Sequence, residues 1–190
     1  PVLTEVVFSE GKTRSFMCAA LSERKDPTEE LIFATNLIKC VMDYMKDKPV
    51  LSSLHVCRGN WSKDESILLK GPYTPLVPLF EETSPNILTL EFSTPRAGEL
   101  DSLLSSEKIK ENSILALGVI NPRTDVIETA QSIIDRAREA LKFISKERLW
   151  LNPDCGFATF SNRPVSTFEI IEKKFEQLQI AKNALREMYE

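Results

Sequence analysis

Short apolar runs alternate along this chain with longer amphipathic ones, and this alternation restricts the fold more than any other feature. The apolar runs span residues 51–57, 87–92, 114–120 and 149–151. They are too short for helices and too apolar for exposed strands, and such strands are expected in a parallel sheet covered on both faces. With helices between them, about four βα units and one α/β domain are predicted.

Three of the amphipathic segments carry helix-start signals. Asp26 stands at an N-cap position before a proline and an apolar stripe, and this helix should run to about Lys46. Asp125 and Ser166 stand at the corresponding positions ahead of two further stripes, which extend to residues 141 and 185. Three long helices are therefore predicted.

Composition and charge exclude several classes of function. The net charge of -4 argues against a nucleic-acid partner, because phosphate binding needs an excess of clustered lysine and arginine. No apolar stretch approaches the roughly 20 residues that span a bilayer, and the first residues do not resemble a signal peptide. No glycine-rich loop follows a predicted strand, which removes the main support for dinucleotide binding.

The four cysteines, at positions 18, 40, 57 and 155, have no paired spacing. A chain of 190 residues does not need disulfides to hold its core, so reduced thiols and a cytoplasmic protein are expected. Cys40 lies on the apolar stripe of the first helix, where we expect a small buried hydrophobe. Cys18 receives no role.

Residues able to hold a metal stand at the ends of three predicted strands. His55 and Cys57 are two apart, so in an extended strand both side chains point the same way. Glu91 ends the second strand and Cys155 follows the fourth. Because carboxyl ends of parallel strands meet at one face, these four side chains form a credible tetrahedral zinc site.

Two architectures fit the strand and helix pattern: an open doubly wound sheet and part of a (β/α)8 barrel. Four units are half of what barrel closure requires. Taken singly, each candidate ligand also fits an ordinary structural role, as a core histidine, a buried cysteine or a solvent-facing glutamate.

The segments LHVCRGN, LTLEFSTPRAGEL, ALGVINPRTDVIE and LWLNPDCGFAT resemble, in this order, the C-terminal catalytic barrel of cobalamin-independent methionine synthases. The shorter single-barrel relatives of that family are the most similar. The resemblance implies the C-terminal half of a (β/α)8 TIM barrel, with zinc held by His55, Cys57, Glu91 and Cys155. It also implies a methyltransferase like 5-methyltetrahydropteroyltriglutamate–homocysteine methyltransferase, in which zinc binds the thiol of homocysteine.

Physical chemistry is consistent with that implied role. A neutral histidine, two thiolates and a carboxylate outweigh the charge of Zn²⁺, which leaves a bound sulfur nucleophilic. Glu91 is the weaker ligand and is expected to yield when the substrate sulfur enters. The expected reaction is an in-line methyl transfer to sulfur without a redox step.

The resemblance also has implications for the first residues of the chain and for residues 120–123. Pro1-Val-Leu3 looks like the tail of a family motif whose acids hold the amino group of homocysteine. Residues 1–190 are thus expected to be one partial domain that pairs with a missing N-terminal half-barrel or forms a homo-oligomer. Where the family has a proton-donating histidine, this chain reads Ile120-Asn-Pro-Arg123, so a methylcorrinoid becomes a plausible donor beside methyltetrahydrofolate.

Three other polar residues follow strand ends. Arg96 and Arg123 could meet an anionic group of a substrate, or could equally be solvated or paired with a helix. Asp154, beside Cys155, could orient a metal ligand.

Three rival functions remain open at this level. The first is zinc-dependent alkylation of another thiol, such as coenzyme M. The second is a non-catalytic zinc-binding fragment or subunit that completes a partner's barrel. A third, a decarboxylase resembling uroporphyrinogen decarboxylase, needs no metal and leaves the four candidate ligands unexplained.

Overall fold

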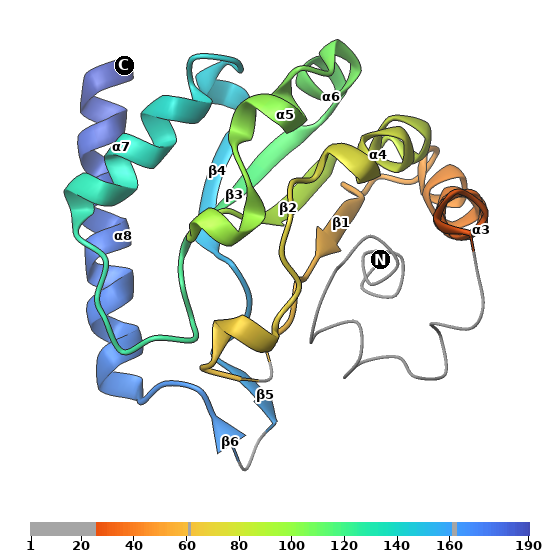
Figure 1. Cartoon of the computed structure of the whole chain (residues 1–190). Helices are drawn as coiled ribbons and strands as arrows, with labels where there is room; N and C mark the ends of the chain where they lie inside the picture. Colours follow the sequence, from red (N-terminus) through yellow and green to blue (C-terminus); the bar gives the residue numbers. More distant parts are fainter. Residues whose placement is uncertain (1–25, 61, 161–162) are drawn as a thin grey trace.

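A four-stranded parallel sheet forms the centre of the computed structural model, which describes residues 26–60, 62–160 and 163–190 (Figure 1). The strands follow one another in chain order, β1-β2-β3-β4, each paired in parallel with the next. Their bounds are β1 (Ser53–Val56), β2 (Ile87–Glu91), β3 (Ile114–Ile120) and β4 (Leu149–Pro153). Three of the predicted apolar runs contain a strand, and β4 begins with the fourth run and extends two residues beyond it, so the predicted parallel α/β arrangement is confirmed.

The helices connect the strands and lie beside the sheet. Figure 1 shows α7 and α8 together on the side of β4, and α3 at the opposite side, beyond β1. The α-helices are α3 (Pro27–Met45), α4 (Val77–Thr83), α5 (Leu100–Leu104), α6 (Glu107–Asn112), α7 (Ala130–Ala140) and α8 (Phe168–Tyr189). The 3-10 turns are η1 (Glu65–Ile67), η2 (Thr74–Leu76), η3 (Pro95–Ala97) and η4 (Lys146–Arg148). Two short antiparallel strands, β5 (Ala158–Phe160) and β6 (Arg163–Pro164), form a separate hairpin before α8.

The predicted cap of the first helix is confirmed, and the other two predicted caps are wrong. Asp26 accepts a hydrogen bond from the amide of Thr28 at 2.8 Å, and α3 ends at Met45. Helix α7 begins after Thr129 rather than after Asp125, because residues 121–129 form a loop beside the candidate site. Helix α8 is capped by Thr167, while the neighbouring Ser166 donates its hydroxyl hydrogen bond to the loop carbonyl of Pro122.

The core lies on the face of the sheet that packs against the helices. Leu54, Leu88, Leu115 and Leu149 stand in register across the four strands and belong to or pack against one hydrophobic cluster with helix residues. Full burial of such a side chain contributes about 1.5–3 kcal/mol. Because side chains alternate along a strand, the neighbours of these leucines face the opposite side of the sheet.

The opposite face is open at both edge strands among the described residues. Along β1, Leu54 and Val56 are buried while Ser53 and His55 are exposed. Trp150 of β4 remains 47 % exposed. The prediction that the strands are covered on both faces is therefore correct for β2 and β3. For β1 and β4 it is wrong in the described part of the chain.

Cys40 is exposed on α3, which corrects the prediction that it is buried. The buried residues of α3 are Ala34 and Met42. Cys40 is two residues past the half-buried Ile38, or about 200° around the helix, so it points away from the sheet. Cys18 and Pro1 to Leu3 lie outside the described residues. No helix in the described ranges is long and apolar enough to cross a bilayer.

Candidate metal centre

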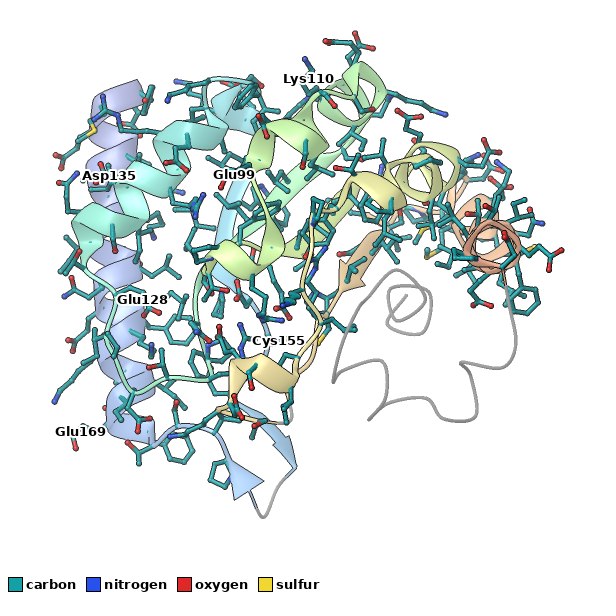
Figure 2. The ribbon with its side chains drawn as sticks, viewed as in Figure 1. Glu99, Lys110, Glu128, Asp135, Cys155 and Glu169 are labelled. Atoms are coloured by element: carbon teal, nitrogen blue, oxygen red, sulfur yellow. The ribbon has the colours of Figure 1, made fainter. Side chains whose placement is uncertain are left out.

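Three potential metal ligands converge at the carboxyl ends of β1 and β4. His55 lies in β1, Cys57 directly follows it, and Cys155 follows β4. The Sγ atom of Cys155 lies 3.2 Å from Sγ of Cys57 and 3.5 Å from Nε2 of His55. All three ligand atoms lie within 4.8 Å of one another, so this group could hold a metal ion. In Figure 2, the labelled Cys155 lies next to the loop that follows β1.

The imidazole of His55 is oriented by the neighbouring strand. Its Nδ1 atom lies 3.0 Å from the backbone carbonyl oxygen of Thr89 in β2. A carbonyl only accepts hydrogen bonds, so Nδ1 carries the proton and Nε2 presents its lone pair. The alternation of β1 therefore places an available nitrogen beside the two cysteine sulfurs.

Glu91 borders the three-residue group from β2. Its side chain is only 2 % exposed, and its Oε1 lies 3.3 Å from Sγ of Cys155. The same oxygen accepts a hydrogen bond from the backbone amide of Arg58 at 3.0 Å. The other oxygen, Oε2, accepts one from Arg96 at 2.9 Å. Glu91 is thus close to the cysteines and also bound to arginine.

The two cysteines share one proton in the absence of a metal. A hydrogen bond from Cys155, together with the neighbouring His55, lowers the pKa of the Cys57 thiol to about 4. The hydrogen bond to Cys57, together with burial, raises the pKa of Cys155. The hydrogen bond with Cys57 raises the pKa of His55. Cys57 is therefore the thiolate, and a metal would displace the proton of Cys155.

Burial also affects the acid beside the cysteines. Desolvation, and secondly the charge of Asp154, raise the pKa of Glu91 to about 7. Desolvation raises the pKa of Asp154 as well. Both carboxylates are therefore costly to keep ionised without positive neighbours.

Those positive neighbours are Arg96 and Arg123, which bind acids of the protein itself rather than solvent. Nη2 of Arg123 lies 2.8 Å from Oδ2 of Asp154, and its Nε lies 3.3 Å from Oε1 of Glu65. The side chains of Arg123 and Arg96 are 0 % and 8 % exposed. Both arginines are thus paired with carboxylates of the protein, those of Glu65, Glu91 and Asp154, and neither is solvated or paired with an α-helix as the sequence had also allowed.

Asp154 holds the end of β2 rather than contacting a candidate ligand directly. Its Oδ1 accepts hydrogen bonds from the amides of Phe92 and Ser93, each at 3.1 Å. Its other oxygen accepts from the hydroxyl of Ser93 and from Arg123. It therefore fixes the chain directly after Glu91.

The long loop after β1 supplies polar contacts that sequence reasoning missed. Nδ2 of Asn60 donates to the carbonyl of Gly156 at 2.6 Å, and the amide of Gly59 donates to Sγ of Cys57 at 3.3 Å. The amide of Glu91 donates to the hydroxyl of Tyr73 at 3.0 Å. The polar Arg-Gly-Asn turn was a signal for Asn60, whereas nothing in the sequence indicated Glu65 or Tyr73.

Asn121 lies in the stretch 120–123, which contains no histidine where the family has a proton donor. Its Nδ2 donates to Oε1 of Glu65 at 2.7 Å, and its Oδ1 accepts from the amide of Arg123. A carboxamide does not transfer a proton at neutral pH, so Asn121 ties two loops together instead.

Parallel βα units with a histidine and two cysteines at the carboxyl ends of the strands define a barrel-type α/β protein with a candidate metal site. Residues 47–170 match the family model described as "Cobalamin-independent synthase, Catalytic domain". The chain belongs to this family.

Individual relatives are distant and much longer. YxjH of Bacillus subtilis, an uncharacterized protein, is 28 % identical over 155 residues, which is 80 % of this chain and 39 % of YxjH. The 5-methyltetrahydropteroyltriglutamate–homocysteine methyltransferase of Bacillus licheniformis is 23 % identical over 86 % of this chain and 19 % of its own length. The 2-hydroxypropyl-CoM lyase of Xanthobacter autotrophicus is 24 % identical over 65 % of this chain and 39 % of its own length. The chain thus spans well under half of each of these relatives.

The fold is shared with part of a solved barrel. A B12-independent methionine synthase from Shewanella sp. W3-18-1, in complex with selenomethionine, superposes with a TM-score of 0.63 at 22 % identity. The superposition covers 80 % of this chain and 43 % of the synthase. The four parallel strands and their helices therefore match part of a methionine synthase barrel, as predicted.

Proposed function

We propose that this chain is the zinc-binding part of a methyltransferase that transfers a methyl group to the thiol of homocysteine and forms methionine. The observation that carries the proposal is the convergence of His55, Cys57 and Cys155 in a chain of the cobalamin-independent synthase family. The three residues come from opposite edges of the described sheet, β1 and β4, so the fold of the whole sheet is needed to bring them together.

The donor atoms fit zinc with Glu91 as the fourth ligand. One imidazole nitrogen, two thiolates and a carboxylate oxygen are ligands that zinc accepts in a tetrahedral arrangement. Oε1 of Glu91 lies 3.3 Å from Sγ of Cys155, within reach of a shared centre. We assign the metal site to His55, Cys57, Glu91 and Cys155, and Zn²⁺ as the cofactor.

Zinc would supply a Lewis acid that lowers the pKa of a substrate thiol, so that the thiolate exists at neutral pH. The two cysteines would add negative charge, which keeps a neighbouring sulfur nucleophilic. Glu91, the least tightly binding donor, would vacate its position for the substrate. In the transfer the sulfur–carbon bond forms as the bond between the methyl group and its donor breaks, and the thiol proton leaves to solvent.

Asn121 bears on the identity of the methyl donor. Methyltetrahydrofolate needs a proton on its leaving nitrogen, and Asn121 offers none. A methylcorrinoid has no such need, and we retain both donors as candidates.

The open edges of the sheet indicate that this chain associates with a partner. Both edge strands are open in the described part of the chain, and β1 carries the exposed Ser53 and His55. We infer that residues 1–190 act as one partial domain, whose barrel is completed by an N-terminal half-barrel or by a second copy. Thiolate ligands require a reducing compartment, so we place the protein in the cytoplasm.

A second candidate changes only the acceptor thiol. The likeness to 2-hydroxypropyl-CoM lyase favours coenzyme M as the alternative to homocysteine. Comparison of the two thiols in the methylation assay separates these candidates. A metal-loaded, complete barrel that methylates neither thiol would favour a non-catalytic zinc-binding role.

Zinc content of the purified protein is the first test. About one zinc per chain is expected in the wild type and in Cys40→Ser, whose exposed sulfur lies on α3. Cys57→Ser and Cys155→Ser should each lose the metal. A folded wild-type protein without zinc after incubation with zinc salts contradicts the proposal.

A further inference from the structure

Two buried arginines approach Glu91 on its Oε2 atom, while Oε1 faces the cysteines. Nη2 of Arg96 lies 2.9 Å from Oε2, and Nη1 of Arg123 lies 3.6 Å from the same oxygen. Oε1 instead lies 3.3 Å from Sγ of Cys155 and accepts the amide of Arg58. The two oxygens of one carboxylate therefore have separate partners.

Arg96 is itself held firmly. Its Nη1 donates to the carbonyl oxygens of Leu69 at 2.6 Å and Arg58 at 3.2 Å. The 3-10 turn η3, Pro95–Ala97, returns the chain so that Arg96 reaches Glu91 from only five residues away. A charged guanidinium whose Nη1 is held by two carbonyl oxygens leaves the carboxylate bound at Nη2 little rotational freedom.

Arg123 restrains the same carboxylate from another strand. It follows β3 and is anchored by Asp154 at 2.8 Å and by Glu65 at 3.3 Å. Arginines from the loops that follow β2 and β3 thus hold Glu91 in place, and neither contact depends on a metal.

We propose that Arg96, assisted by Arg123, is a positioning residue that turns Glu91 so that only Oε1 can reach the metal. The inference rests on the proposed zinc site. A glutamate restrained in this way acts as a one-oxygen ligand, so only one metal–oxygen bond has to be exchanged for a bond to the substrate sulfur. Neither arginine needs to touch the substrate.

A double-mutant cycle between positions 91 and 96 tests the proposal. Zinc affinity is measured by competition with a chromophoric chelator for the wild type, Glu91→Gln, Arg96→Met and the double variant. We expect Arg96→Met to lose about 10–100-fold in affinity, as removal of such partners commonly does. In the Glu91→Gln background the same substitution should have no further effect.

Cobalt substitution supplies a second readout that does not depend on activity. The visible spectrum of the Co²⁺ protein should change in the same direction in Arg96→Met and Glu91→Gln, because the first misplaces the carboxylate ligand and the second replaces it with a weakly binding carboxamide. Arg96→Lys keeps the charge and should recover part of the affinity. Arg136→Met removes a partly exposed arginine that pairs with Glu139 on α7, and should match the wild type.

Each remaining outcome decides against the proposal in a different way. An equal loss of affinity in both backgrounds, or an unchanged affinity and cobalt spectrum, overturns it while the zinc site stands. A wild-type protein that binds neither metal overturns the proposed function as well. If Arg96→Met does not fold, the cycle is run with Arg96→Lys and read by the same criteria.

Discussion

Gly118 lies in β3 at a point where any side chain would collide with Asp154. A Cβ atom there would overlap Oδ1 of Asp154 and lie 2.7 Å from the carbonyl oxygen of Leu90. The missing side chain lets Asp154 reach the amides of Phe92 and Ser93. Gly118 therefore supports the arrangement that follows Glu91.

Gly118→Ala should destabilise the protein by about 1–3 kcal/mol, because the added methyl group must displace Asp154 or the backbone of β2. Urea unfolding followed by circular dichroism measures the change. Gly156→Ala is the matched control, since a Cβ there meets nothing within 4 Å, and it should stay within about 0.5 kcal/mol of the wild type. Equal stabilities for the two variants would contradict the collision.

At the scale of residues, the sequence predicted the convergence of three candidate ligands better than it predicted their surroundings. His55, Cys57 and Cys155 were predictable because parallel strands end at one face, and the structure brings these three together. Glu65 and Tyr73 were not predictable, since they lie in a loop without a periodic pattern. The prediction that Cys40 is buried was wrong, because an apolar stripe does not indicate how much of a helix surface is covered by the rest of the protein.

Helix α7 shows how a loop can shift a helix start. Thr129 accepts a hydrogen bond from the amide of Ser132 at 3.1 Å, whereas Asp125 pairs with Lys63 across the loops. Both positions fit the sequence signal for a cap, and only the path of the loop distinguishes them.

Thr129→Ala should cost about 1 kcal/mol of stability through loss of the cap. Asp125→Ala removes only an exposed ion pair and should cost under about 1 kcal/mol, with no change in helix content. Thermal unfolding of both variants measures the difference. A larger loss for Asp125→Ala than for Thr129→Ala would restore the predicted cap.

Lys174 fixes α8 to the loop that follows β3. Its buried ammonium group lies 2.9 Å from Oε2 of Glu128 and donates to the carbonyl oxygens of Asn121 and Val126. Figure 2 shows Glu128 beside α8, the helix that carries Lys174. The same loop carries Arg123, so α8 supports the surroundings of Glu91 indirectly.

Lys174→Met should cost roughly 3 kcal/mol, because Glu128 and two carbonyls lose their donor. Lys173→Met, one residue away, breaks only an exposed pair with Glu169 and should cost under about 0.5 kcal/mol. Chemical denaturation of the two variants gives the comparison. Similar small losses in both would show that the buried pair adds nothing.

At the scale of elements, length decided what was predictable. The four strands and the long helices α3, α7 and α8 carry enough residues for their periodicity to be read. Helices α4, α5 and α6 have seven, five and six residues, less than two turns, so no stripe develops. The hairpin of β5 and β6 is shorter still.

At the scale of the whole molecule, the described part resembles a section of a barrel with a free strand edge on either side. Among the described residues, the unpaired edges of the sheet are those of β1 and β4. Beside β4, residues of β4, α8 and the segment between α7 and β4 line a cavity of about 590 Å³, and Trp150 on its wall is 47 % exposed. Open parallel edges next to apolar side chains favour association, since closure of a barrel would pair both edges.

A polypeptide carrying the first four βα units of a family barrel is therefore expected to bind this chain. Light scattering coupled to size exclusion should show a one-to-one complex. Hydrogen exchange should slow at the backbone amides of the edge strands β1 and β4, while β2 and β3, already paired on both sides, change little.

Trp150→Asp should prevent that association without unfolding the chain, because the side chain is half exposed here but would be buried in a closed barrel. Phe168→Asp changes an 85 % exposed aromatic residue that does not line the cavity, and it should bind as the wild type does. Binding that survives Trp150→Asp, or slowed exchange confined to β2 and β3, would mean that the partner docks elsewhere. Loss of binding in Trp150→Asp alone would place the contact along β4, where completing the barrel also completes the surroundings of Cys155.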